Sequence, residues 1–151
     1  IVSGEISSLA KSRYVMLEFP VDIDYETIAE AIRDVSMDGY IPIVSHVETY
    51  SCLDEDEDMV EDLIKLGAYI QVDSGSVMGE NGHDIRNFAR KLVKNEMVHF
   101  IATDAHDCDD KAPLMKECAE YIERKCGFDY MNEVLYINPM AIIENDDVEI
   151  I

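Results

Sequence analysis

Short apolar runs alternate along this chain with longer stretches in which apolar residues recur every three or four positions. The short runs have the length and composition of strands, and the longer ones have the periodicity of amphipathic helices. The predicted strands are residues 14–19, 41–44, 68–72 and 98–102, and the predicted helices are 25–37, 59–66, 85–95 and 114–125. The pattern therefore predicts a repeated strand–helix unit.

The residues at the ends of the predicted helices agree with this order. Asp24 can cap the first helix, and Pro113 suits the first turn of the fourth. Gly39 and Gly67 stand just past helix ends, where a left-handed residue is needed.

Two of the predicted strands, 41–44 and 98–102, are almost wholly apolar, which is typical of a parallel sheet covered on both faces. The fold class is therefore α/β. An open doubly wound sheet and part of a barrel both fit, and no glycine-rich phosphate loop follows any strand. In either architecture ligands bind at the carboxyl ends of the strands.

The composition limits the partners and the location of the protein. The 151 residues carry a formal charge of −21, which repels nucleic acid and anionic membranes, and no apolar run is long enough to span a bilayer. The acidic run 54–58 is interpreted as a solvated first helical turn rather than a calcium loop, because it lacks the glycine and closing glutamate of an EF-hand. The four cysteines show no CxxC spacing, so we expect free thiols in a reducing, cytoplasmic compartment.

Polar residues stand where the predicted strands end. Carboxylates and imidazoles gathered at the mouth of a parallel sheet suit divalent metals such as manganese, zinc or iron. These strand-end residues are Glu18, His46, Asp73 with Ser74, and Asp104 with His106.

Each of these residues also has an ordinary structural interpretation. Asp104 and His106 fit a helix cap and a surface histidine equally well when taken alone. Glu18 could form a surface ion pair, but its place between two apolar neighbours favours a cation or hydrogen-bond donors beside it. His46 follows an apolar strand directly, which favours a ligand over a core histidine. His99, inside a predicted strand, is expected to be structural, and His83 to lie on the surface.

Taken together and in order, the strand blocks resemble those of the PHP-type bacterial protein-tyrosine phosphatases that control capsule and exopolysaccharide synthesis. The resemblance covers essentially the whole chain and rests on residues 14–20, 41–48, 67–76 and 99–106, with Asn138-Pro139 and Ile142-Ile143 near the end. It implies that residues 1–151 are the C-terminal portion of a single PHP domain, a distorted (β/α)7 barrel related to the TIM barrel. The chain opens at Ile1 without the family's N-terminal His-x-His block, so we expect a missing upstream part.

The resemblance also implies a centre of up to three metal ions, usually manganese, with iron or zinc as other candidates. Glu5 matches a glutamate that bridges two ions, and Glu18 and His46 match ligands of one of these. Asp104 matches a ligand near the first metal, and His106 a ligand of the remaining ion.

This chain departs from the family at its phosphate-binding positions and near its start. Thr49 and Lys111 stand where the family usually has arginine, and lysine offers a point charge in place of a bidentate fork. The stretch between Glu5 and Glu18 is shorter than usual.

The expected activity is metal-assisted hydrolysis of a phosphomonoester, with Asp104 or His106 assisting proton transfer and Lys111 contacting the phosphate. The substrate implied by the resemblance is a phosphotyrosine protein, with a bacterial tyrosine kinase as a candidate partner. Three alternatives remain: a phosphatase for a small metabolite such as histidinol phosphate, a non-catalytic partner-binding domain, and a hydrolase of C–N bonds. A thiol phosphatase is excluded, because no Cys-x5-Arg follows Cys108. Unpaired strand edges predict that the chain alone dimerises or aggregates.

Overall fold

The computed structural model describes residues 8–103 and 113–148. The predicted site residues Glu5, Asp104, His106 and Lys111 lie outside the described residues, as does Cys108. The remaining strand-end residues, Glu18, His46, Asp73 and Ser74, lie within them.

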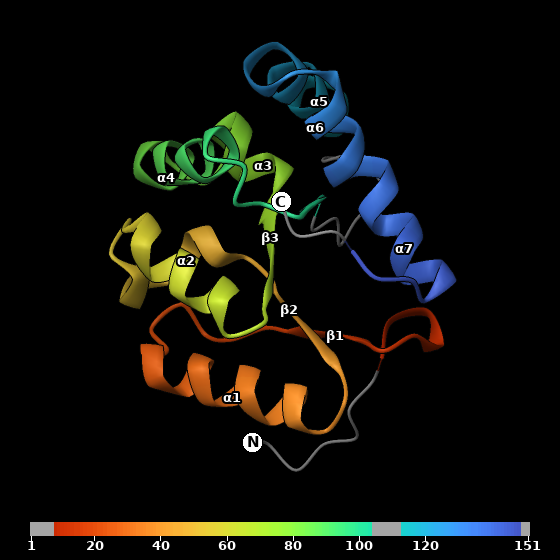
Figure 1. The fold of residues 1–151 in the computed structure, drawn as a ribbon. Coiled ribbons are helices and arrows are strands. Elements are labelled where there is room, and N and C mark those ends of the chain that lie inside the picture. The colour runs from red at the N-terminus through yellow and green to blue at the C-terminus, as the bar shows by residue number, and fades with distance from the viewer. Residues whose placement is uncertain (1–7, 104–112, 149–151) are drawn as a thin grey trace.

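A four-stranded parallel sheet forms the centre of the described structure (Figure 1). Its strands follow one another in chain order, and each pairs in parallel with the next. They are β1 (Tyr14–Leu17), β2 (Ile41–Val44), β3 (Tyr69–Asp73) and β4 (Phe100–Ala102). This arrangement confirms the α/β class, and the described strands form an open sheet.

Helices connect successive strands, as the sequence predicts. The main ones are α1 (Tyr25–Met37), α2 (Glu57–Lys65) and α4 (His83–Lys94), and a further helix, α5 (Pro113–Cys126), comes after β4. Each predicted helix is present with its ends within about two residues of the prediction, whereas β1 ends at Leu17 rather than Phe19. The expected caps are confirmed as well: Asp24 accepts a hydrogen bond of 2.8 Å from the Thr27 amide, and Gly39 and Gly67 have φ angles of 86° and 108°.

Several short elements were not predicted. One helix, α3 (Ser74–Met78), follows β3 directly. After α5, the chain forms a continuous helical segment that runs back along the molecule (Figure 1). This segment comprises α6 (Phe128–Asn132), the π-helix η4 (Glu133–Ile137) and α7 (Asn138–Glu144). Short 3-10 turns complete the list: η1 (Leu9–Lys11), η2 (Val47–Thr49) and η3 (Ser51–Leu53).

The larger hydrophobic core lies between one face of the sheet and the connecting helices. Burial of such side chains supplies the main driving force for folding. From the strands it contains Val44, Ile70 and Val72, and from the helices Ile28, Ile32, Leu63, Leu92 and Ile122, all of which are fully buried.

A smaller core covers the opposite face of the sheet. Ile43 and Phe100 pack there with Ala141 of α7 and with Val148. Two tyrosines hold the end of the described chain in place. The Tyr14 hydroxyl donates to the Asp146 carbonyl (2.6 Å) and accepts from the Val148 amide (3.0 Å), and the Tyr69 hydroxyl donates to the Val148 carbonyl (2.8 Å). The C-terminal segment is thereby fixed across the amino ends of the strands.

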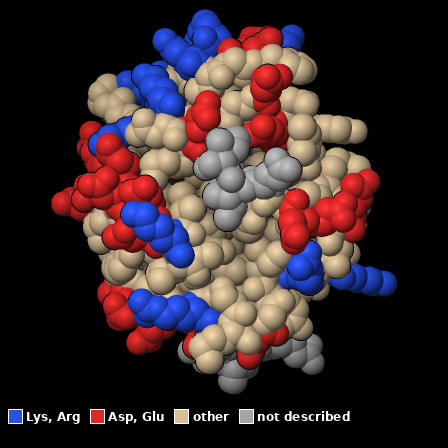
Figure 2. Space-filling view, viewed as in Figure 1, with Lys and Arg blue, Asp and Glu red and all other residues tan. Residues whose placement is uncertain are grey.

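The surface agrees with the acidic composition. Figure 2 shows carboxylates spread over this face, interrupted by separate groups of lysine and arginine side chains, so this face offers no broad basic area to nucleic acid. The second half of the acidic run begins α2 as expected, since Asp56 is the N-cap residue and Glu57 lies in the first turn, whereas Asp54 and Glu55 precede the helix with left-handed backbones. No helix in the described ranges is long and apolar enough to cross a membrane.

Candidate functional site

The carboxyl ends of three neighbouring strands bring Glu18, His46 and Asp73 together. His46 lies in the middle, with its Nδ1 2.8 Å from Asp73 Oδ2 and its Nε2 3.5 Å from Glu18 Oε1. These residues line a surface cavity of about 420 Å³, whose walls also include Phe19, Val21, Thr49, Asn81 and Ile85. The convergence that strand order predicts is therefore present for these three residues.

A tight turn presents His46 at the end of β2. His46 has a left-handed backbone with φ of 54°, which is uncommon for a residue other than glycine. The Thr49 amide and hydroxyl both donate to the His46 carbonyl, at 2.9 and 2.7 Å. Thr49 therefore stabilises the turn that places the imidazole.

Tyr50 joins the ends of β1 and β2. Its buried hydroxyl donates to the Ser45 carbonyl (2.7 Å) and accepts from the Phe19 amide (3.1 Å). Ser45 in turn donates to the Leu17 carbonyl through both its amide and its hydroxyl. This clamp fixes the backbone on both sides of Glu18 relative to His46. The role of Tyr50 was not predicted, because a tyrosine four residues after the candidate ligand His46 belongs to no recognisable motif.

Replacing Tyr50 with phenylalanine is expected to lower the free energy of unfolding by about 2 kcal/mol, because it leaves the Phe19 amide and Ser45 carbonyl without their partner. Urea unfolding measures the change. Tyr136→Phe is the matched control, since that ring is 62% exposed and its change should be within about 0.5 kcal/mol. Equal effects of the two substitutions would contradict the clamp.

Glu48 is buried directly behind the site. Its Oε1 accepts a hydrogen bond of 3.0 Å from the Asp73 amide. Burial, and then the neighbouring Asp73 carboxylate, raise the pKa of Glu48 to about 7. Glu48 Oε2 and Asp73 Oδ1 are buried without a hydrogen-bond partner among the described residues. Glu48 was not among the predicted site residues.

Glu18 and His46 fit a divalent ion as part of a ligand set. The Asp73 contact engages His46 Nδ1, so Nε2 is the ring nitrogen that faces the Glu18 carboxylate. Within residues 8–103 and 113–148, no group of three His, Cys, Asp or Glu side chains could hold an ion by itself. The Glu18 side chain is 67% exposed, so its apolar neighbours do not withdraw it from water. It lies beyond the end of β1, where the sheet no longer covers it.

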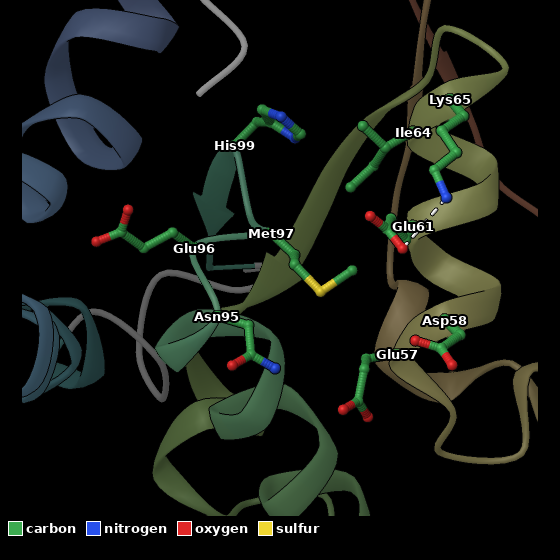
Figure 3. Close-up of a pocket in the computed structure, with 9 residues that line it drawn as sticks. All are labelled: Glu57, Asp58, Glu61, Ile64, Lys65, Asn95, Glu96, Met97 and His99. Atoms are coloured by element: carbon green, nitrogen blue, oxygen red, sulfur yellow. Dashed lines mark ion pairs between the residues drawn. The ribbon is translucent and has the colours of Figure 1, made fainter.

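A second cavity, of about 390 Å³, lies at the amino end of β4 (Figure 3). Carboxylates of α2 face the segment from Asn95 to His99 there, and Glu61 pairs with Lys65 at 3.3 Å. His99 is structural, as predicted, since it is buried and its Nδ1 accepts a hydrogen bond of 3.0 Å from the Ile70 amide. It precedes β4 by one residue. His83 lies on the surface, also as predicted.

Comparison with known proteins assigns this chain to a family. The model of the family described as "Capsular polysaccharide synthesis, CpsB/CapC" matches residues 1–144. This chain belongs to the CpsB/CapC family. Tyrosine-protein phosphatase CpsB of Streptococcus pneumoniae is 32% identical over 144 residues, which are 92% of this chain and 59% of that protein. Tyrosine-protein phosphatase YwqE of Bacillus subtilis is 29% identical over 127 residues, 84% of this chain and 50% of that protein.

A solved structure also matches this CpsB/CapC chain. It comes from crystal structures of YwqE from Bacillus subtilis and CpsB from Streptococcus pneumoniae, described as metal-dependent tyrosine phosphatases. The TM-score is 0.85 at 27% identity, and the match covers 94% of this chain and 57% of the other. The parallel α/β arrangement is thus that of a family structure. The chain spans 50% to 59% of the length of these two relatives.

Proposed function

We propose that this domain is a metal-dependent phosphomonoester hydrolase, and specifically a manganese-dependent protein-tyrosine phosphatase that regulates capsule or exopolysaccharide synthesis. The observation that carries the proposal is the pairing of His46 Nε2 with Glu18 Oε1 at the carboxyl ends of parallel strands, 3.5 Å apart. Its relatives CpsB and YwqE bear the name tyrosine-protein phosphatase, and the solved family structures are of metal-dependent enzymes.

In this proposal, Glu18 and His46 hold one ion, and Glu5, Asp104 and His106 are further ligands of the metal centre. A bound ion supplies Lewis-acid activation of water and neutralises charge on the phosphate oxygens. The protein's own contribution is to hold the ligands rigidly, which Tyr50 and Thr49 do through their hydrogen bonds around His46 and Phe19. Asp104 or His106 would move a proton to the leaving oxygen, and Lys111 would contact the phosphate.

The apolar side chains in the cavity walls favour an aromatic phosphate ester as the substrate. Phe19, Val21 and Ile85 line the cavity beside the polar strand-end residues. Val21 is 56% exposed, so this apolar surface is open to a ligand. An aryl group against these side chains would bring its phosphate toward Glu18 and His46, where the ion is expected. Such amphipathic cavities, apolar with a few convergent polar groups, are typical binding sites.

The remaining parts of the proposal concern the whole protein. We infer that the sheet is part of a distorted (β/α)7 barrel of PHP type and that residues 1–151 are the C-terminal portion of that one domain. A phosphotyrosine protein would be the substrate, and a bacterial tyrosine kinase is the partner that the activity requires. The cytoplasm, where such a kinase domain and free thiols are found, is the proposed location.

A small-metabolite phosphatase is the second candidate, favoured by one observation. Thr49 stands at a usual arginine position and lines the cavity, and no arginine is among the described residues that do so. A site without a guanidinium fork binds phosphate less specifically.

Phosphate release by the full-length protein distinguishes these functions. A phosphotyrosine peptide and histidinol phosphate are compared, each with Mn²⁺ and with a chelator, and Asp104→Ala serves as the inactive variant. We expect manganese-dependent release from the peptide. Release from histidinol phosphate alone would establish the second candidate, and no release from either would leave a partner-binding domain.

A further inference from the structure

A buried carboxylate contacts His46 on the side of the ring away from Glu18. Asp73 Oδ2 lies 2.8 Å from His46 Nδ1, and the Asp73 side chain is only 8% exposed. An ionised carboxylate only accepts hydrogen bonds, so its contact of this length with a ring nitrogen is made when that nitrogen carries the proton. The described geometry therefore favours a proton on His46 Nδ1.

The position of that proton decides which atom of His46 can bind an ion. A neutral imidazole has one N–H and one lone pair, and the hydrogen bond made by one nitrogen sets the state of the other. With the proton on Nδ1, the lone pair lies on Nε2, the nitrogen that faces Glu18 Oε1 at 3.5 Å. The opposite tautomer would turn an N–H toward that ligand position.

Asp73 is itself held by two independent constraints. It is the last residue of β3 and pairs in register with Ala102 of β4. Its amide donates to Glu48 Oε1 at 3.0 Å, and Glu48 is buried. The backbone that carries Asp73 is therefore fixed by the sheet and by a neighbouring buried side chain. The Asp73 carboxylate is also buried, in contrast to that of Glu18, which is mostly exposed.

We propose that Asp73 is a positioning residue, which fixes the Nδ1–H tautomer and the ring orientation of His46 and thereby prepares Nε2 to bind a divalent ion. The inference rests on the metal site of the proposed function. Carboxylates that orient metal-binding histidines in this way commonly contribute a factor of 10 to 100 to metal affinity. In this chain Asp73 takes that role because β3, which it ends, lies next to β2, which His46 follows.

Nitrogen NMR of the metal-free, full-length protein tests the tautomer directly. The histidines are labelled with ¹⁵N, the His46 signals are assigned with the His46→Ala variant, and spectra are recorded at a pH where the ring is neutral. We expect a protonated Nδ1 and an unprotonated Nε2 in the wild type. Asp73→Asn retains an oxygen acceptor and should keep this tautomer, whereas Asp73→Ala should shift His46 toward the Nε2–H form.

Calorimetric titration with Mn²⁺ alone supplies the second readout. Asp73→Ala is expected to weaken Mn²⁺ binding by about 10- to 100-fold, while Asp73→Asn stays within about threefold of the wild type. Asp129→Ala, a change at an exposed position on α6, is the matched control and should leave both readouts unchanged.

The outcomes separate this inference from the proposed function. A wild-type His46 with its proton on Nε2 would overturn the inference even if Asp73→Ala failed to fold, and so would an Asp73→Ala protein with unchanged tautomer and Mn²⁺ affinity. If both readouts behave as expected but no phosphate is released from any substrate, the positioning role stands and the proposed function fails.

Discussion

Replacing His46 with alanine is expected to lower manganese-dependent phosphate release by the full-length protein on the order of 100-fold or more. The substitution removes the nitrogen that faces Glu18, and the loss of even an outer partner of a ligand costs 10- to 100-fold in such sites. It also leaves the Asp73 and Glu18 carboxylates without the imidazole between them. Raising the Mn²⁺ concentration should restore part of the activity, because the remaining ligands still bind the ion weakly.

Initial rates with a phosphotyrosine peptide over a range of Mn²⁺ concentrations measure this loss. His83→Ala is the matched control, because it is the same substitution at an exposed position that begins α4. Its rate should equal that of the wild type. A His46→Ala enzyme with an unchanged rate and unchanged Mn²⁺ dependence would remove His46 from the metal site.

The pH dependence of stability is expected to change in opposite directions when Glu48 or His99 is replaced. Burial lowers the pKa of His99 from its ordinary 6.5 to about 4, and burial next to Asp73 raises that of Glu48 from 4.5 to about 7. The stability due to neutral His99 is present above pH 6.5 and is lost as the pH falls through 4. The stability due to protonated Glu48 is present below pH 4.5 and is lost as the pH rises through 7.

In the wild type these two contributions oppose each other between about pH 4.5 and 6.5. Each pKa difference corresponds to about 3 kcal/mol. In the Glu48→Gln variant only the His99 contribution remains. As the pH is lowered from 7 to 4, the free energy of unfolding of this variant should therefore fall by about 3 kcal/mol relative to that of the wild type, in which Glu48 compensates. His99→Gln should show the reverse trend and lose stability as the pH is raised from 4.5 to 7.

Urea unfolding of the metal-free protein at several pH values measures these slopes. The other carboxylates titrate alike in both variants, so the difference between the two slopes isolates the pair. A double variant, Glu48→Gln with His99→Gln, should return to a pH dependence close to that of the wild type. Parallel curves for the two single variants would show that neither group is perturbed as its burial implies.

Local patterns were sufficient to predict the main elements. The apolar periodicity of residues 25–37 gave the bounds of α1, because an amphipathic helix with a capping aspartate and a following glycine is specified within a few turns. The helices from α6 to α7 were not predicted. Tyr130 and Val134 pack in the larger core and Ala141 in the smaller one, and a π-turn lies between α6 and α7, so no single period persists.

The candidate site was only partly predictable for a similar reason. The positions of Glu18, His46 and Asp73 after apolar runs indicated that they would converge, since parallel strands end at one edge. The sequence pattern did not indicate which atoms of these side chains would contact one another. The pairing of Asp73 with Nδ1 and the clamp made by Tyr50 depend on a left-handed turn at His46 and on contacts between separate strands.

The sequence by itself determined the α/β class, the order of strands and helices, their caps, and the places of Glu18, His46 and Asp73 at the strand ends. These features depend on local backbone preferences and on the burial of periodic apolar side chains, which neighbouring residues encode. The tertiary structure alone decided that Glu18 stays in water, that Glu48 is buried behind the site, and that Asp73 orients His46. Solvation and hydrogen-bond geometry at these residues depend on atoms from several strands and turns, and these are brought together only by folding.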